Sequence, residues 1–335
     1  MVIERVGVAD ISKSKVKSLE RESIDKLIKI ERLLVEYPRF NKLLELMEEC
    51  HSCSKYSVEP HCLFIKGDTG VGKTTLIRKY ISRYPRRNSR DGTQIPVFNS
   101  SLPAIATIKG VASKLISDLG DPLALRGTTV QQTERFIRLL KSCKVELLIF
   151  DEFQHLVESG SRKTLSNVAD WLKAVINETG IPMILFGMPC SDDLLCQNRQ
   201  LKRRFMAVEK LSSFNWGNSA DSQKDYRLFL ATIDKQLPFP ERSCLAERDI
   251  AHRFFCATRG NVGATMSIVR WSARFALKEK ATSCKEYLSR GFERQYGIKI
   301  ERSRNPFSCD QATLEPASSL LFGQGFSLGQ ILSAS

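Results

Sequence analysis

No stretch of this 335-residue chain approaches the roughly 18 consecutive apolar residues that a membrane-spanning helix needs. The first residues, MVIERVGVADISKSK, are charged and lack the apolar core of a secretory signal. Ten cysteines are scattered along the chain, and without an export signal they favour reduced thiols over a disulfide framework. These absences predict a cytoplasmic protein with no membrane partner.

Acidic residues are also in short supply. The chain has 37 Asp and Glu against 51 Lys and Arg, which gives a formal net charge of +14. So basic a protein has a physical reason to bind polyanions, nucleic acid above all. The alternative is a basic surface that serves solubility alone, and composition does not separate the two.

One motif has a specific chemical meaning. The string GDTGVGKTT fits G-x-x-x-x-G-K-[ST] and lies between an apolar run, Cys62–Ile65, and a helix-compatible run, Thr75–Ile81. Its glycines let the backbone N–H groups wrap a polyphosphate, and the helix N-terminus favours the anion. Lys73 would reach the β- and γ-phosphates, and the Thr74 hydroxyl would bind Mg²⁺. The predicted ATP-binding residues are Gly67, Asp68, Thr69, Gly70, Val71, Gly72, Lys73, Thr74 and Thr75.

A second string, LLIFDE, ends at Glu152 and complements the first. Its four apolar residues predict a buried parallel strand with Asp151 and Glu152 at the carboxyl end, where open α/β sheets bind ligands. Asp151 is then a candidate for holding Mg²⁺, and Glu152 for the base that orients the attacking water. The alternative is an ordinary acidic pair at a strand end. The complete phosphate loop upstream favours ATP hydrolysis.

One cysteine cluster could bind a metal. The spacing of Cys50 and Cys53 suits zinc, and His61 with Cys62 could complete four ligands. However, Cys62 also begins the apolar strand before the phosphate loop, where a small buried thiol fits well. We therefore do not expect a metal site there.

The periodicity of apolar residues predicts a doubly wound core followed by a helical region. Strands are expected near 62–66, 95–98, 147–150, 182–186 and 205–211, with helices between them, including a short one at 192–197. From about Phe214 only helical patterns remain. The predicted divisions are an N-terminal helical extension (1–56), an α/β nucleotide-binding core (57–212), a helical lid (213–304) and a flexible tail (305–335).

This layout resembles the AAA+ ATPases from Cys62 to about Lys280. The resemblance implies a P-loop core, with a parallel five-stranded sheet between helices, and a C-terminal all-helical lid. The string NRQLKRRF resembles the arginine-finger region of that family. This implies that Arg203 or Arg204, with Arg199 behind them, acts in a neighbouring subunit's site. The alternative is a solvated basic surface.

Two positions depart from the AAA+ pattern. Where that family places a polar sensor after the fourth strand, this chain has Gly187-Met188-Pro189, so Cys190 or Ser191 would have to substitute. The string TRGNVGATMSIV resembles the second-sensor helix but carries Gly263 or Ala264 where an arginine is usual. These departures imply slow or partner-stimulated hydrolysis.

A narrower resemblance joins several strings in order over 30–268. EYPRFNKLLELME, GDTGVGKTT, FDEFQHL, LFGMP, LKRRF and RGNVG resemble the bacterial TniB/TnsC family of transposition-regulating AAA+ ATPases. The resemblance implies ATP-dependent rings or filaments of this chain on duplex DNA, bridging a target selector to the transposase. In members from CRISPR-associated transposons the selector is joined through a TniQ-type adaptor. The DNA contacts that it implies, non-specific and to the backbone, are Thr107, Lys109, Arg126 and Thr129.

Two other functions compete with this one. A replication initiator or helicase loader would share the ATPase core, but an initiator usually adds a helix-turn-helix domain. The roughly 30 nearly uncharged residues after Asn305 are too short and polar to form one. The third possibility is a signalling NTPase that does not act on DNA. The sequence leaves open the oligomer number, ring or filament, the selector and the role of the tail.

Overall fold

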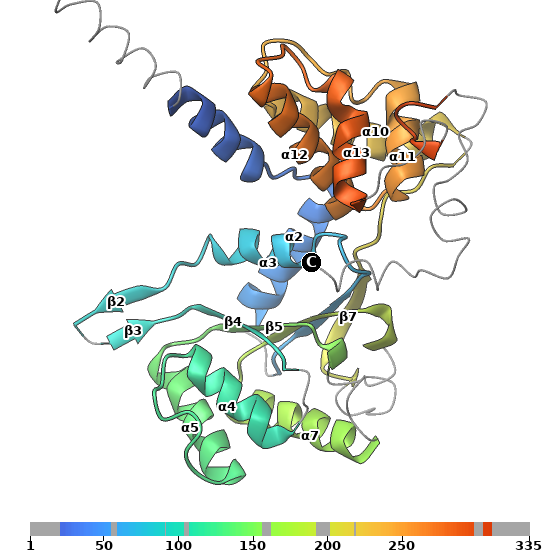
Figure 1. Cartoon of the computed structure of the whole chain (residues 1–335). Coiled ribbons are helices and arrows are strands. Elements are labelled where there is room, and N and C mark those ends of the chain that lie inside the picture. The colour runs from blue at the N-terminus through green and yellow to red at the C-terminus, as the bar shows by residue number, and fades with distance from the viewer. Residues whose placement is uncertain are drawn as a thin grey trace, which may run out of the picture. The chain divides into compact units, whose positions relative to one another are not determined.

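The chain divides into two compact units, each with its own core. One unit runs from Pro38 to Ser212, and the other joins the residues up to Tyr37 to those from Ser213 onward (Figure 1). The structure, a computed structural model, describes residues 21–54, 59–90, 92–103, 107–155, 162–191, 202–217, 219–297 and 304–309. The helix expected at 192–197, Arg199, and most of the predicted tail (310–335) lie outside these residues.

The Pro38–Ser212 unit alternates strands with helices along the chain. Its elements are α2 (Pro38–Cys53), β1 (Cys62–Lys66), α3 (Lys73–Ile81), β2 (Arg87–Ser89), β3 (Gly92–Gln94), β4 (Val97–Ser101), α4 (Ile108–Asp118), α5 (Thr129–Ser142), β5 (Leu147–Asp151), α7 (Arg162–Thr179), β6 (Met183–Gly187), the 3₁₀ turn η1 (Pro189–Ser191) and β7 (Phe205–Lys210). Each expected strand is present. The second one begins at Val97 because Pro96 has no N–H to donate to the ladder.

Five of these strands form one parallel sheet in the order β4-β5-β6-β1-β7. In its centre, Phe64 of β1 lies opposite Leu185 of β6, and Ile149 of β5 lies opposite Ile184. The predicted parallel five-stranded sheet is therefore confirmed. Because parallel strands point the same way, β1, β5 and β6 end at one edge of the sheet.

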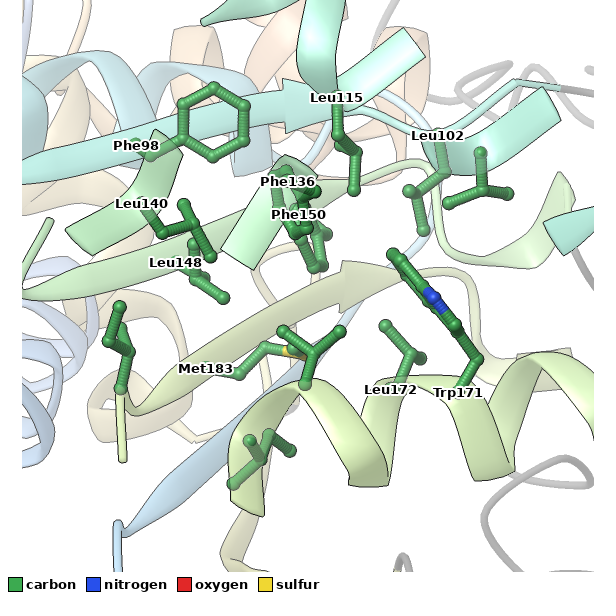
Figure 2. Close-up of a cluster of buried hydrophobic side chains, with 14 of the residues drawn as sticks. Phe98, Leu102, Leu115, Phe136, Leu140, Leu148, Phe150, Trp171, Leu172 and Met183 are labelled. Atoms are coloured by element: carbon green, nitrogen blue, oxygen red, sulfur yellow. The ribbon is translucent and has the colours of Figure 1, made fainter. Parts of the chain in front are cut away.

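Helices cover both faces of this sheet, with α2 and α3 on one side and α4, α5 and α7 on the other (Figure 1). On the second face the helices and strands share one buried cluster, shown in Figure 2. Phe136 of α5 stacks on Trp171 of α7 at 6.0 Å between ring centroids and meets Phe98 of β4 at 6.2 Å. This packing fixes the sheet whose edge carries the site.

The antiparallel hairpin of β2 and β3 was not expected from the sequence. Arg87 lies opposite Gln94, and Ser89 lies opposite Gly92. Its side chains are mostly exposed, so the alternation of apolar and polar residues that marks a half-buried strand is absent.

The other unit is all-helical in the residues described, as predicted for the lid. Its elements are a helix at 21–31, α10 (Ala220–Gln236), α11 (Arg248–Thr258), α12 (Val262–Lys278), the 3₁₀ turn η2 (Lys285–Tyr287) and α13 (Leu288–Tyr296). In the described part of the chain, no helix is both long and apolar enough to cross a membrane.

The N-terminal segment is divided between the two units at Pro38. Tyr37 packs against Phe214 and Phe229 of the helical unit, with ring centroids 4.9 and 5.7 Å away. The Arg270 guanidinium donates to the carbonyls of Ile30 and Leu33, each at 3.4 Å. Residues 1–56 were expected to form one extension, but α2 belongs to the α/β unit and the described residues before it, 21–37, belong to the helical unit.

Candidate nucleotide site

The phosphate loop joins the end of β1 to the start of α3. Gly70 and Gly72 have φ angles of 78° and 104°, a region that glycine adopts without strain. Gly67 is confined by space instead, because a Cβ there would lie 2.3 Å from the carbonyl oxygen of Leu211. No side chain caps the first turn of α3, so its N–H groups face the loop and suit a polyphosphate.

Lys73 directs its ammonium group back into the curve of this loop. The residue is 8% exposed, and its Nζ donates to the carbonyl oxygens of Gly67 at 2.5 Å and Asp68 at 3.0 Å. Burial lowers the pKa of Lys73, while the charges of Glu152, Asp151 and Asp68 act in the opposite direction. A cation with these neighbours is ready to bind phosphate oxygens.

The structure brings Thr74 and Asp151 together from positions 77 residues apart. The Thr74 hydroxyl donates to Oδ2 of Asp151 at 3.2 Å. Asp151 is 7% exposed, and burial raises its pKa, against hydrogen bonds from the Glu152 N–H and from Thr74. Hydroxyl and carboxylate oxygens are ligands that Mg²⁺ prefers. This donor pair, beside the phosphate loop, fits a nucleotide-bound Mg²⁺.

Glu152 leaves the strand in an unusual backbone conformation, with φ of 57°. A non-glycine residue in this left-handed region costs about 1–3 kcal/mol and is found mainly where function requires it. Its N–H donates to Asp151 Oδ1 at 2.9 Å. Its carboxylate accepts a hydrogen bond from Gln154 and lies 3.9 Å from the His155 Nε2. The two acidic side chains therefore have different partners, Thr74 for Asp151 and Gln154 for Glu152.

The backbone after β6 borders the same site. The Gly187 carbonyl accepts the Gly67 N–H at 3.0 Å. Ser191 is fully buried, and its Oγ has no hydrogen-bond partner among the described residues, whereas Cys190 is exposed. That Cys190 or Ser191 acts as the polar sensor stays a prediction.

In the helical unit, Gly263 and Ala264 lie in the first turn of α12, which Asn261 caps by accepting the Ala264 N–H at 3.0 Å.

The two arginine-finger candidates differ in their surroundings. Arg204 is bound within its own unit, to Glu59 at 3.1 Å and to the Asn177 Oδ1 at 2.8 Å, and its side chain is only 20% exposed. Arg203 is exposed. A residue that serves a neighbouring subunit must reach outward, so the structure favours Arg203 over Arg204.

The four candidate DNA contacts lie on α4, on α5 and beside them. Thr107 is the N-cap of α4 and accepts the Gly110 N–H at 3.0 Å. Lys109 and Arg126 are exposed, and Thr129 begins α5. The side chains of Lys109 and Arg126 are open to a phosphate, whereas the Thr107 hydroxyl already serves its helix.

The cysteine cluster is arranged for packing. The Cys50 thiol donates to the His61 carbonyl at 2.9 Å, Cys62 is buried in the sheet, and Cys53 is exposed. Burial raises the pKa of the Cys62 thiol to about 12. In the described residues, no three metal-binding side chains come together.

Sequence reasoning missed one residue beside the site, Gln154. It is 4% exposed and forms hydrogen bonds with both Glu152 and Met188. A polar residue two positions after the acidic pair was the available signal, but its second partner is 34 residues away.

Comparison with solved structures supports the fold. The chain is similar to Cdc6p from Pyrobaculum aerophilum (TM-score 0.56, 13% identity, covering 90% of this chain and 85% of that chain). It is also similar to the ORC2 protein of Aeropyrum pernix in ADPNP–ADP complexes (TM-score 0.55, 12% identity, covering 91% of this chain and 82% of that chain). A third similar structure is that of the ORC1 protein of Aeropyrum pernix in complex with DNA (TM-score 0.55, 15% identity, covering 81% of this chain and 67% of that chain). With the observed sheet order, these matches show the AAA+ ATPase fold.

Comparison with protein families gives the identity. No curated protein matches the chain. The family described as "Bacterial TniB protein" matches residues 26–216, a span that contains the whole α/β unit with its phosphate loop and acidic pair. Because this match covers more than half of the 335 residues, the chain belongs to the TniB family.

Proposed function

We propose that this protein is an ATP- and Mg²⁺-dependent regulator of DNA transposition that assembles on duplex DNA. The observation that carries the proposal is the convergence of Lys73, Thr74, Asp151 and Glu152 at one edge of the sheet of a TniB-family protein. Assembled subunits bridge a target-selection complex, through a TniQ-type adaptor, to the transposase. ATP hydrolysis then drives disassembly.

The chain's own residues account for nucleotide binding. The loop 67–72 and the first turn of α3 surround the polyphosphate with N–H groups, and Lys73 binds the β- and γ-phosphate oxygens. Thr74 and Asp151 would hold Mg²⁺, which neutralises charge on the phosphates when bound. Glu152 accepts a proton from the attacking water and orients it.

DNA binding is supported by charge and by fold. The net charge of +14 favours a polyanion. The ORC1 protein of Aeropyrum pernix, which has this fold, was solved in complex with DNA. Lys109 and Arg126 then contact phosphates, so binding carries little sequence information. An initiator-type ATPase of the same fold would differ by reading sequence.

Replacement of Lys73 tests nucleotide binding. We expect Lys73→Ala to weaken ATP binding on the order of 100-fold or more, because a buried cation aimed at the phosphates is lost. Arg78→Ala is the matched control, since Arg78 is an exposed cation on the same helix. Titration with a fluorescent ATP analogue measures both. Unchanged affinity in the Lys73 variant would refute the phosphate-loop assignment.

Replacement of Glu152 separates binding from hydrolysis. Glu152→Gln should retain ATP binding, since Lys73, Thr74 and Asp151 remain, while the hydrolysis rate falls by about 10²- to 10⁴-fold through loss of the base. Assemblies on DNA should then last longer, because ATP supports contact between subunits. Phosphate release and dissociation from labelled duplex measure the two effects. Dissociation at the wild-type rate would show that hydrolysis does not control disassembly.

The dependence of DNA binding on salt tests the nature of the contacts. A protein that neutralises several phosphates releases counterions, so we expect affinity to fall on the order of 10³-fold between about 50 and 200 mM salt. Affinity should vary little among duplexes of different sequence. Fluorescence anisotropy with three unrelated duplexes checks both expectations. A strong preference for one short sequence would favour an initiator instead.

Replacement of Arg203 tests action between subunits. Arg203→Ala should slow hydrolysis on the order of 10³-fold, the scale of arginine fingers, without weakening ATP binding by the monomer. Mixing it with Lys73→Ala subunits should restore part of the activity, since these donate an intact Arg203 to a neighbour with an intact phosphate loop. If mixed assemblies form on DNA and stay inactive, Arg203 does not act in trans.

A further inference from the structure

The buried amide of Gln154 connects the acidic pair to the strand beside it. Gln154 lies two residues after Glu152 and is 4% exposed. Its Oε1 accepts the backbone N–H of Met188 at 3.1 Å, and its Nε2 donates to Oε2 of Glu152. The side chain therefore spans two segments of the nucleotide site.

The chemistry of its partners fixes the orientation of this amide. The Met188 N–H can only donate, so the oxygen of the Gln154 side chain must face it. An ionised Glu152 carboxylate can only accept, so the nitrogen must face that side. Reversing the amide would break both contacts and leave the buried Gln154 amide without partners, which is costly. Gln154 is thus a directed donor to Glu152.

Few other groups restrain the Glu152 carboxylate. In the described part of the chain, the hydrogen bond from Gln154 is the one that reaches it. The His155 Nε2 lies 3.9 Å away, beyond hydrogen-bond distance. The N–H of Glu152 is directed to Asp151 and does not hold its own side chain. Gln154 is therefore the described residue that hydrogen-bonds this carboxylate, beside an ion-pair contact with His155.

The second partner of Gln154, Met188, lies next to a residue that contacts the phosphate loop. Met188 follows Gly187, whose carbonyl accepts the N–H of Gly67, the first residue of that loop. The last residue of β6, Gly187, thus contacts the loop directly, and the next residue, Met188, is connected to Glu152 through Gln154. The phosphate loop and Glu152 are therefore connected to adjacent residues, Gly187 and Met188.

We propose that Gln154 is a positioning residue that holds the Glu152 carboxylate for hydrolysis and ties it to the backbone after β6. The inference rests on the proposed ATPase function and specifies how its base is held. A purely structural role, in which the amide only fills buried space, makes a different prediction: stability would change, but the hydrolytic step would not.

The test replaces Gln154 by methionine, which has a similar shape and cannot donate a hydrogen bond. We expect kcat for ATP hydrolysis to fall about 10- to 100-fold, as misplacement of a reacting group does, with the ATP dissociation constant unchanged. Gln223→Met in α10 is the matched control. It is also a 4% exposed glutamine, with its Nε2 donated to the Gly217 carbonyl at 2.9 Å, and its loss should leave kcat unchanged.

A second measurement asks whether Gln154 acts through Glu152. In a Glu152→Gln background the base is already lost, so adding Gln154→Met should cause no further decrease in single-turnover hydrolysis. An equal decrease in both backgrounds, or a wild-type kcat for Gln154→Met, would overturn the proposal. So would a loss confined to ATP affinity.

Two further outcomes are distinguishable. If Gln154→Met does not fold, Gln154→Asn keeps an amide that is one methylene too short to span both partners, and its kcat should also fall. A folded Asn variant with wild-type kcat would overturn the inference. Failure of the wild-type protein to hydrolyse ATP, with or without DNA, would refute the proposed function and this inference together. Normal wild-type hydrolysis with no effect at Gln154 would refute this inference alone.

Discussion

The candidate site depends on parallel hydrogen bonding among three central strands. β6 pairs with β1 on one side and with β5 on the other, so the phosphate loop and the acidic pair start from the same sheet edge. Two backbone hydrogen bonds extend this pairing past the ends of β1 and β5. The Gly67 N–H donates to the Gly187 carbonyl at 3.0 Å, and the Phe153 N–H donates to the Phe186 carbonyl at 2.9 Å. Without this register, Thr74 and Asp151 would not meet.

The opposite charges of Lys73 and Asp151 stabilise one another at this edge, although burying each charged group costs free energy of hydration. Lys73 loses hydration, which lowers its pKa, and Asp151 loses hydration, which raises its pKa. Their mutual attraction and the carbonyls around the ammonium group offset that cost. Charged groups held in this way need little rearrangement to bind phosphate and a divalent cation.

Membership of the TniB family and the AAA+ fold place this chemistry in a known architecture. Two residues of this chain have partners that the family match alone does not give. Arg204, bound to Glu59 and Asn177, strengthens its own unit, whereas Arg203 remains exposed. Gln154 links the acidic pair to the backbone after β6.

The sequence by itself determined the order of strands and helices, the parallel sheet and the residue types of the phosphate loop, because apolar periodicity and loop glycines act within a few residues. It did not reveal the β2–β3 hairpin, whose exposed side chains carry no periodic signal. Nor could it assign the residues on the two sides of Pro38 to different units, pair Arg204 with Asn177 or join Gln154 to Met188. These features depend on contacts between residues far apart in the chain, and only the tertiary structure brings such residues together.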